Sequence, residues 1–149
     1  MEIAGKTSIN KKYIKLLQST YSDSKAAIKT DTGISRFVNI LKGVKQGDIL
    51  PALLFCIIVA SINLQTEEEC NTGFSICGQL LSNLSYADDI AAINNNHVKL
   101  QLFINSLAKQ AAEVGLFINI SKTKCMTTAK NNQILNLTIY NKQIKRSGP

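Results

Sequence analysis

The stretch that decides the fold is residues 80–93, LLSNLSYADDIAAI. Two apolar, strand-like runs flank a tight polar turn that carries two adjacent carboxylates, Asp88 and Asp89. A pair of acids at the tip of a hairpin is a natural site for Mg²⁺, a hard cation that prefers oxygen ligands. Two such ions can hold the attacking and leaving oxygens of a phosphoryl transfer. An isolated Tyr-Ala-Asp-Asp is more often an ordinary solvated turn, so the rest of the chain has to decide between the two interpretations.

The composition indicates a folded, basic protein. The chain has 149 residues, of which 45% are hydrophobic, and this suits one domain or one large piece of a larger domain. A formal net charge of +7 favours a polyanionic partner such as nucleic acid. Trp is absent and aromatic residues make up only 6%, which argues against a stacking platform for single-stranded bases.

The cysteine and hydropathy patterns argue against a zinc site, a secreted protein and a membrane span. The four cysteines form no C-x-x-C pair, and His97 is near none of them. Cys56 lies in an apolar run and is expected to be a small buried hydrophobe. No apolar signal segment opens the chain, and the most apolar run, residues 49–62, is too short to span a bilayer and contains Pro51. We expect an intracellular protein without membrane contact, and the choice between nucleus and cytoplasm stays open.

The N-terminal half predicts a helix, a hairpin and a second helix. Ser8 can cap the first helix, whose apolar positions run from residue 9 to residue 20, with its lysines solvated. Residues 25–29 and 34–41 then form a hairpin through Asp31-Thr32-Gly33. Pro51 opens the second helix, which should run to about Gln65. Because this helix is apolar almost all round, we expect it to be deeply buried. An acidic surface patch follows it, made of Glu67, Glu68 and Glu69.

The C-terminal half predicts two hairpins around a third helix. Residues 74–81 form a small hairpin that leads into the strand before Tyr86. Asn95 or Asn96 caps the third helix, and Gly115 ends it. Strands are expected at residues 116–120, 125–128 and 134–140, and residues 141–149 are expected to fray. Helices segregated from antiparallel strands predict an α+β fold in one domain, residues 1–149, with the acids at one edge of a sheet and helices behind it.

A loop ahead of the second helix carries residues suited to nucleotide binding. It reads Gly-Val-Lys-Gln-Gly-Asp over residues 43–48. Gly43 and Gly47 let the backbone approach a ligand closely. Lys45 can meet a phosphate, and Gln46 can donate to or accept from a base or sugar edge. A simple turn before a helix explains the same loop equally well.

A lysine-containing turn follows the third helix, in residues 115–126, GLFINISKTKCM. An ammonium in this turn could reach a pyrophosphate leaving group. We assign that possibility to Lys122, whereas Lys124 is expected to be an ordinary solvated lysine.

Taken together, the three segments resemble the reverse transcriptase family, in particular the enzymes of non-LTR retrotransposons. Motif B of that family, G-V-[RK]-Q-G-[DC] before an apolar helix, matches residues 43–48. Motif C, an aromatic residue followed by x-Asp-Asp, matches residues 86–89, and motif D, Gly-Leu followed by Asn-x-x-Lys-Thr-x-x-Met, matches residues 115–126. The motifs occur in family order with helices between them, and three in register override the interpretation of residues 86–89 as a chance turn.

The resemblance implies a role for each matched residue. Asp88 would be a ligand of both catalytic metals, Asp89 would assist the metal site, and Lys122 would act near the triphosphate as a proton donor to pyrophosphate. Tyr86 and Ala87 would line the primer end. The residues that would contact the incoming nucleotide and the template are Gly43, Lys45, Gln46 and Gly47. The implied cofactor is Mg²⁺ or Mn²⁺, and the implied partners are an RNA or DNA template-primer, a deoxynucleoside triphosphate and the remainder of the polymerase.

Two departures from the family pattern bear on activity. Residues 49–52 read Ile-Leu-Pro-Ala where family members often have Pro-Leu-Ser-Pro, so a Ser cap is lost. The third carboxylate, supplied by motif A, has no counterpart, because Asp23 and Asp31 are the only acids between Glu2 and Asp48 and neither lies in a matching strand. Two divalent ions need more carboxylate charge than one Asp-Asp hairpin provides. We therefore expect a palm fragment with part of the fingers that binds metal weakly and is inactive or nearly so alone.

Two alternatives to a polymerase fragment stay open, a non-catalytic nucleic-acid-binding module and a decayed retroelement remnant. For the palm fragment itself, a sheet without its partner strand should be marginally stable and should expose apolar surface.

Overall fold

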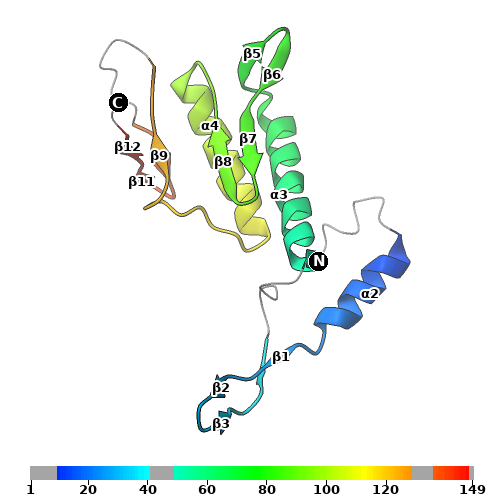
Figure 1. The fold of residues 1–149 in the computed structure, drawn as a ribbon. Helices are drawn as coiled ribbons and strands as arrows, with labels where there is room; N and C mark the ends of the chain where they lie inside the picture. The colour runs from blue at the N-terminus through cyan, green and yellow to red at the C-terminus, as the bar shows by residue number, and fades with distance from the viewer. Residues whose placement is uncertain (1–9, 41–48, 129–135, 148–149) are drawn as a thin grey trace. The chain divides into compact units, whose positions relative to one another are not determined.

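The computed structural model describes residues 10–40, 49–128 and 136–147. The chain divides into two compact units, Met1–Leu54 and Phe55–Pro149. Both contain helices and short strands (Figure 1). The expected α+β class is confirmed in this coarse sense, because the described residues form helices and small, mainly antiparallel sheets.

The first described helix is α2 (Lys11–Tyr21), and it begins after Asn10. The side-chain oxygen of Asn10 accepts a hydrogen bond from the backbone N–H of Lys12 at 2.9 Å. This bond satisfies one of the N–H groups that a helix start leaves unpaired. The residue that caps α2 is therefore Asn10 and not, as the sequence predicted, Ser8. Ser8 lies outside the described residues. The lysines of this helix are exposed, as expected: Lys11, Lys12 and Lys15.

The expected N-terminal hairpin is confirmed, as two short ladders. β2 (Lys29–Thr30) pairs with β3 (Gly33–Ile34), and β1 (Lys25–Ala26) pairs with β4 (Val38–Asn39) further from the turn. Between the ladders, the Ser35 hydroxyl accepts a hydrogen bond from the backbone N–H of Ile28 at 2.8 Å. No residue from 10 to 40 is buried, so this hairpin has no core among the residues that the structure describes.

The apolar helix α3 (Ile49–Cys70) is longer and less buried than expected. It continues to Cys70 rather than ending near Gln65. Val59 and Ile62 are buried, but Leu64 is 60% exposed. Cys56 is also exposed, so its expected burial is wrong. A helix that is apolar on every side does not reveal in its sequence which side a neighbour covers. Among its described residues, the buried ones lie on one side of α3.

The length of α3 also overturns the argument that its apolar run is too short for a bilayer. By length and composition alone, Leu50–Cys70 could cross a membrane. The core helix of a soluble protein passes the same test, so the finding is weak evidence for a span. The last turns of α3 contain Glu67 and Glu69, which accept hydrogen bonds from neighbouring elements of the second unit.

The helix α4 (His97–Glu113) joins two small cores in the second unit. Phe103, Leu107 and Ala111 pack with Ile62 of α3, and Ile90 of the strand β8 (Asp89–Ala92) packs against this first core. The second core lies against another face of α4; its buried members are Ile104, Cys125, Leu137, Ile139 and Ile144. Figure 1 shows α4 between α3 and the C-terminal strands.

Both ends of α4 are confirmed as expected. At the start, the Asn96 side-chain oxygen accepts from the backbone N–H groups of Val98 at 2.9 Å and Lys99 at 3.2 Å. At the end, Gly115 has a φ of +77°, the left-handed conformation that favours glycine. The N–H of Leu116, beyond it, donates to the carbonyl of Ala111 at 2.9 Å and so closes the last turn.

The hairpin expected at residues 74–81 is confirmed. β5 (Phe74–Ile76) pairs with β6 (Gln79–Leu81). The two turn residues, Cys77 and Gly78, have φ angles of 50° and 80°. Positive φ angles at both central residues are typical of a type I′ turn, whose twist matches that of paired strands.

The C-terminal strands differ from the expected pattern. Residues 116–120 form no strand, and β9 is limited to Lys124–Cys125. β9 pairs in parallel with β12 (Lys145–Arg146), and β10 (Thr138–Ile139) pairs with β11 (Lys142–Gln143). Residues 141–147, expected to fray, thus contain two short strands. Every sheet in the described residues has two strands, so the single larger sheet expected from the sequence is not formed there.

Candidate active site

The Tyr-Ala-Asp-Asp segment forms the turn of a hairpin between β7 (Asn83–Tyr86) and β8. Tyr86 is the strand partner of Asp89, so Ala87 and Asp88 are the two turn residues. Ala87 has a φ of 52°, a conformation that costs an L-residue with a side chain roughly 1–2 kcal/mol. The turn therefore holds Asp88 at its tip through a strained backbone position.

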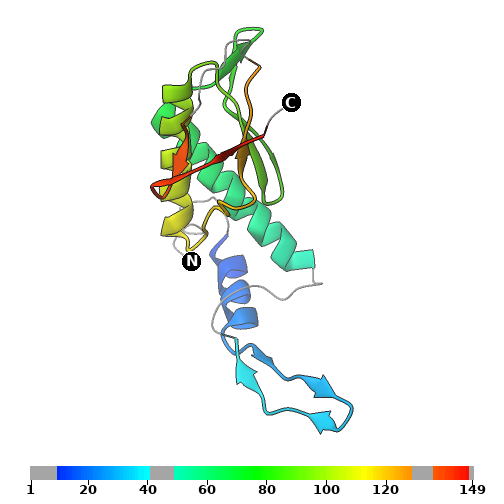
Figure 2. The same cartoon turned by 90° about the vertical axis from the view of Figure 1, so that its left-hand side faces the viewer.

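The alternation of side chains gives the hairpin two different faces. Ser85 and its partner Ile90 lie on the face toward the helices, since Ser85 bonds to α3 and Ile90 packs on the α3–α4 core. Tyr86 and its partner Asp89 lie on the opposite face, where both are exposed. Figures 1 and 2 show the hairpin lying on one side of the α3–α4 pair. The acid of β8 is thus directed away from the core.

Polar side chains of α3 hold the base of this hairpin. The carboxylate of Glu67 accepts hydrogen bonds from the Ser82 hydroxyl and, at 2.9 Å, from the Asn83 side-chain amide. One turn earlier on α3, the amide of Asn63 donates to the Ser85 hydroxyl at 2.7 Å. Asn63 and Ser82 are buried, so the loss of either bond would leave a buried polar group without that partner, which is costly.

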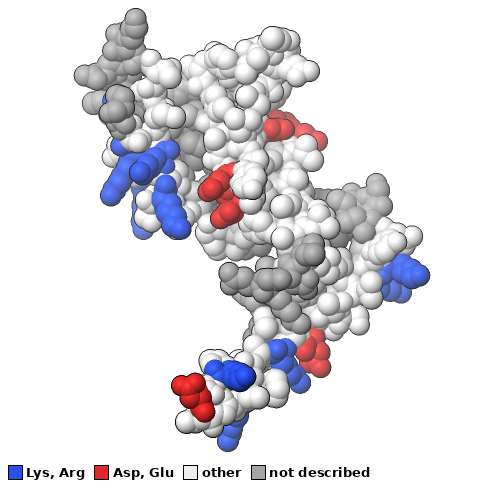
Figure 3. All heavy atoms as spheres, viewed as in Figure 1, with Lys and Arg blue, Asp and Glu red and all other residues white. Residues whose placement is uncertain are grey.

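The two carboxylates at the turn are exposed and unpaired. Neither the Asp88 nor the Asp89 side chain makes a hydrogen bond or ion pair within the described chain. Tyr86, beside them, is 85% exposed. Figure 3 shows acidic atoms gathered over the turn of this hairpin. No residue that the structure describes therefore occupies their acceptor sites.

The donor set at the turn fits part of a Mg²⁺ site. Two adjacent carboxylates supply the hard oxygen ligands that Mg²⁺ and Mn²⁺ prefer. In the part of the chain that the structure describes, no group of three or more His, Cys, Asp or Glu residues lies close enough together to hold a metal ion. A two-metal site needs further ligands beyond these two acids.

The lysine turn after α4 is organised by Asn119. Its carbonyl accepts from the backbone N–H of Thr123 at 3.0 Å and from the Thr123 hydroxyl at 2.8 Å, while its side chain accepts from the Ser121 hydroxyl at 2.8 Å. These bonds give Asn119 and Thr123 a structural role, because they close the turn that carries Lys122. Lys122 is exposed, and in the described residues no bond joins it to Asp88 or Asp89. The structure thus forms the turn without bringing Lys122 into contact with the acids.

The remaining candidate residues, Gly43, Lys45, Gln46 and Gly47, lie outside the described residues.

The family comparison matches almost the whole chain. Residues 2–140 match the family model described as reverse transcriptase (RNA-dependent DNA polymerase). The chain belongs to the reverse transcriptase family.

Two curated relatives identify the kind of reverse transcriptase. Both are retrovirus-related Pol polyproteins from type-1 retrotransposable element R2. The protein of Nasonia vitripennis is 28% identical over 109 residues, which are 73% of this chain and 10% of that protein. The protein of Popillia japonica is 25% identical over 119 residues, which are 79% of this chain and 17% of that protein. The expected resemblance to reverse transcriptases of non-LTR retrotransposons is confirmed, and the chain spans less than a fifth of either relative.

Sequence reasoning missed the residues that fix the reverse transcriptase hairpin and its supporting helices. Glu67 and Glu69 were assigned to a solvated acidic patch, but each bonds to a neighbouring element. The available signal was the spacing of Asn63, Thr66 and Glu67, three polar residues that share one side of the helix by their i, i+3 and i+4 positions. Asn63 and Glu67 bond to the hairpin from this side of the helix, whereas the Thr66 hydroxyl donates to the carbonyl of Ile62 within α3.

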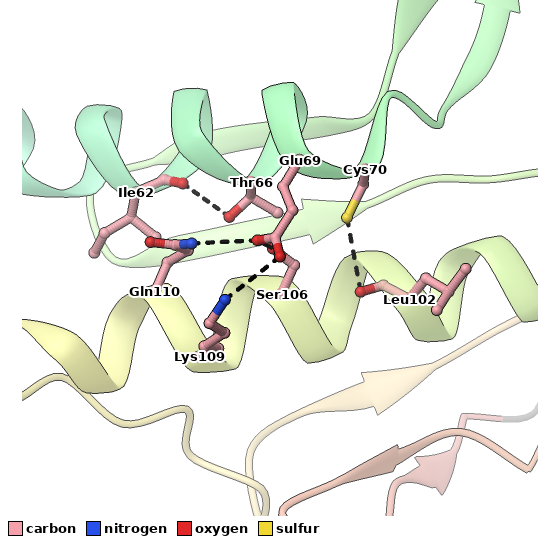
Figure 4. A network of polar contacts seen from close by, with 8 residues as sticks. All are labelled: Ile62, Thr66, Glu69, Cys70, Leu102, Ser106, Lys109 and Gln110. Atoms are coloured by element: carbon pink, nitrogen blue, oxygen red, sulfur yellow. Dashed lines mark hydrogen bonds and ion pairs between the residues drawn. The ribbon is translucent and has the colours of Figure 1, made fainter.

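Glu69 fixes α3 to α4 (Figure 4). Its carboxylate accepts from the Ser106 hydroxyl at 2.6 Å, the Gln110 amide at 3.2 Å and the Lys109 ammonium at 3.5 Å. The hydrogen bond from Ser106, with those from its neighbours, lowers the pKa of Glu69 below its ordinary value. A cleft of about 380 Å³ opens beside these contacts. Its lining residues are Glu69, Cys70, Leu102, Asn105, Ser106 and Lys109, which belong to the helix seam and not to the β7–β8 turn.

Proposed function

We propose that this chain is the palm portion of an RNA-directed DNA polymerase, with the β7–β8 turn as part of its metal site. The observation that carries the proposal is the pair of exposed, unpaired carboxylates, Asp88 and Asp89, at a two-residue turn in a chain of the reverse transcriptase family. Phosphoryl transfer depends on position and charge neutralisation more than on covalent chemistry, and free carboxylates on a fixed turn suit that requirement.

The proposed roles of the individual residues follow the family pattern. Asp88, at the tip, would be a ligand of both ions, and Asp89, at the first position of β8, would assist the metal site. Bound Mg²⁺ or Mn²⁺ would neutralise charge on the transferring phosphoryl group. Tyr86 and Ala87 line the primer end. Lys122 gives a proton to the pyrophosphate that leaves. The incoming nucleotide and the template are contacted by Gly43, Lys45, Gln46 and Gly47.

The substrates are an RNA or DNA template-primer and a deoxynucleoside triphosphate. The remainder of the polymerase supplies the third carboxylate and most of the fingers and thumb. We propose that α3 is a packed helix and not a membrane span, because polar residues along its covered side bond to the hairpin and to α4. We also propose that the protein acts inside the cell, as its family implies.

The 149 residues alone should be inactive or nearly so. With two carboxylates instead of three, the site would hold Mg²⁺ or Mn²⁺ only weakly. A misplacement of the reacting groups by about 1 Å can cost about a hundredfold in rate. Primer extension with Mg²⁺ or Mn²⁺ tests this expectation. Clear synthesis by the 149-residue chain that disappears in Asp88→Asn would overturn it.

The role of Asp88 needs a longer polypeptide that includes the upstream family segment with motif A. In that polypeptide, Asp88→Asn should abolish extension. The matched control is Asp31→Asn, which changes another exposed Asp in a hairpin turn and should leave extension unchanged. Unchanged synthesis in Asp88→Asn would refute the proposed metal site.

The net charge of +7 favours a second candidate, a nucleic-acid-binding module that keeps the fold but has no catalytic role. Salt-dependent binding to a primer-template, without synthesis by the longer polypeptide, would favour this alternative.

A further inference from the structure

Asn63 is a buried polar residue that packing alone does not explain. Its side chain is 8% exposed and lies on the same side of α3 as the buried Val59 and Ile62. Its amide nitrogen donates to the Ser85 hydroxyl at 2.7 Å, whereas its amide oxygen is buried and accepts no hydrogen bond from the described residues. A buried acceptor without a partner is destabilising, and an apolar side chain would avoid that cost. Stability alone therefore favours an apolar residue here, so the bond to Ser85 is the feature that the asparagine supplies.

Two hydrogen bonds fix the strand β7 along α3. Asn63 holds Ser85, and four residues further along the helix Glu67 accepts from the Asn83 amide at 2.9 Å. Four residues of a helix rise about 6 Å and two residues of a strand span about 6.8 Å, so the two attachment points are spaced alike on both elements. The Ser85 hydroxyl also donates to the Asn83 side-chain oxygen at 2.9 Å, which joins the two points. A single bond would let the strand pivot about it, whereas two bonds define its direction.

The bond from Asn63 lies at the end of β7 that is nearer to the acidic turn. Ser85 pairs with Ile90, and the next pair, Tyr86 with Asp89, closes the turn. Ser85 and Ile90 are the last pair before the turn that contacts the helices, because Tyr86 and Asp89 are exposed on the opposite face. Within the described chain the two carboxylates of the turn make no bond of their own. Their direction therefore depends on how Ser85 is held.

We propose that Asn63 is a positioning residue, which through Ser85 sets the direction of the Asp88 and Asp89 carboxylates and so their affinity for a divalent cation. A cation bound by two neighbouring carboxylates is sensitive to their direction, because its coordination geometry is defined. Residues that orient metal ligands contribute about 10–100-fold to metal affinity. Asn63 acts through Ser85 and touches neither ligand, so we expect the lower end of that range, about tenfold. The inference rests on the proposed function, which places the cation at this turn.

Mn²⁺ binding to the 149-residue chain tests the proposal, with free Mn²⁺ followed by electron paramagnetic resonance. The variant Asp88→Asn defines which part of the binding belongs to the turn. Asn63→Leu keeps the branching at Cγ but removes both the donor and the unpaired acceptor, so it should weaken this part about tenfold while Tm stays within about 4 °C. The matched control is Gln65→Leu, the same change from amide to leucine on the same helix. Gln65 makes no hydrogen bond within the described residues, so its replacement should leave Mn²⁺ affinity unchanged.

Ser85→Ala separates positioning from stability. It leaves the buried amide of Asn63 without its one partner in the described chain, so it should lower both Tm and Mn²⁺ affinity. The double variant Asn63→Leu/Ser85→Ala removes both polar groups, and its Tm should recover. Its Mn²⁺ affinity should stay about tenfold weak and no weaker than in either single variant, because all three lack the same bond. A bond with only a structural role would instead restore affinity together with Tm.

The possible failures are distinguishable. If Asn63→Leu keeps Mn²⁺ affinity within about twofold while Asp88→Asn loses it, the cation is at the turn and the positioning role alone is refuted. Recovery of Mn²⁺ affinity in the double variant would also refute that role. If Asp88→Asn binds Mn²⁺ as tightly as the unchanged protein, the turn does not hold the cation, and the proposed metal site fails together with this inference.

Discussion

Of the three glutamates in the acidic run of residues 67–69, Glu67 should be the one that stabilises the β7–β8 hairpin. Removing its carboxylate in Glu67→Ala deletes the two hydrogen bonds to Ser82 and Asn83 at the base of β7. A hydrogen bond to a charged group contributes about 1.5–3 kcal/mol, and Ser82 is buried, so its hydroxyl would lose its acceptor. Glu67 itself is half-buried, which places the expected loss near the lower end, at about 3 kcal/mol for the pair.

The matched control is Glu68→Ala, one residue further along the same helix. Glu68 is exposed and makes no hydrogen bond within the described residues. Both substitutions remove one negative charge and add the same helix-favouring residue, so they differ only in the bonds to β7. Exposed substitutions of this kind change stability by about 0.5 kcal/mol or less.

Urea unfolding of the two variants measures the difference in free energy, and thermal melting gives an independent check. For a chain of this size, about 3 kcal/mol corresponds to a drop of roughly 6–12 °C in Tm. Hydrogen exchange should also show faster opening at the start of β7 in Glu67→Ala than in Glu68→Ala, since β7 then keeps only the bond from Asn63 to Ser85 as its side-chain hydrogen bond to α3 in the described residues. Equal stability of the two variants would refute the conclusion that α3 fixes the hairpin through this carboxylate.

Three further predictions follow from local geometry. Ala87→Gly should raise the free energy of unfolding by about 0.5–1 kcal/mol in urea titrations, because relief of a positive φ outweighs the added freedom of the unfolded glycine; a loss of stability would contradict the strained turn. Gly73→Ala should lower it by about 1–3 kcal/mol, because the new Cβ would lie 2.6 Å from the backbone carbonyl oxygen of Leu81; an unchanged urea midpoint would exclude this close approach. Glu69 has a lowered pKa, so its contribution to stability is complete above the ordinary value of 4.5 and is lost as the pH falls below it. The difference in unfolding free energy between the unchanged protein and Glu69→Gln should therefore shrink as the pH falls below 4.5, and a constant difference would refute the role of the ionised carboxylate.

Short-range signals were the most predictable from sequence. The turn at Ala87-Asp88, the cap at Asn96 and the helix end at Gly115 each depend on a few neighbouring residues whose backbone preferences are strong. The same holds for the turn at Cys77-Gly78. These features are local, so the sequence contains all the information needed to predict them.

Features that depend on a distant partner were mispredicted. The parallel pairing of Lys124 with Lys145 joins segments twenty-one residues apart, and no periodicity in either segment indicates it. Cys56 was expected to be buried because its neighbours are apolar, yet burial depends on which side of α3 another element covers. Glu67 was expected to be solvated because charged runs usually are, and only the fold brings Ser82 to it.

One helix, α4, contributes to both hydrophobic cores of the second unit. Phe103 belongs to the core that supports β8 and the acidic turn, while the next residue, Ile104, belongs to the core beneath β9 and β12. Adjacent residues on a helix project about 100° apart, so a single element can support a surface on each side. Glu69 fixes α4 to α3, and Gln101 fixes it to β10 through two hydrogen bonds between its side chain and the backbone of Thr138. The acidic turn and the C-terminal strands are therefore both positioned by the packing of α4, even though neither contains a residue of that helix.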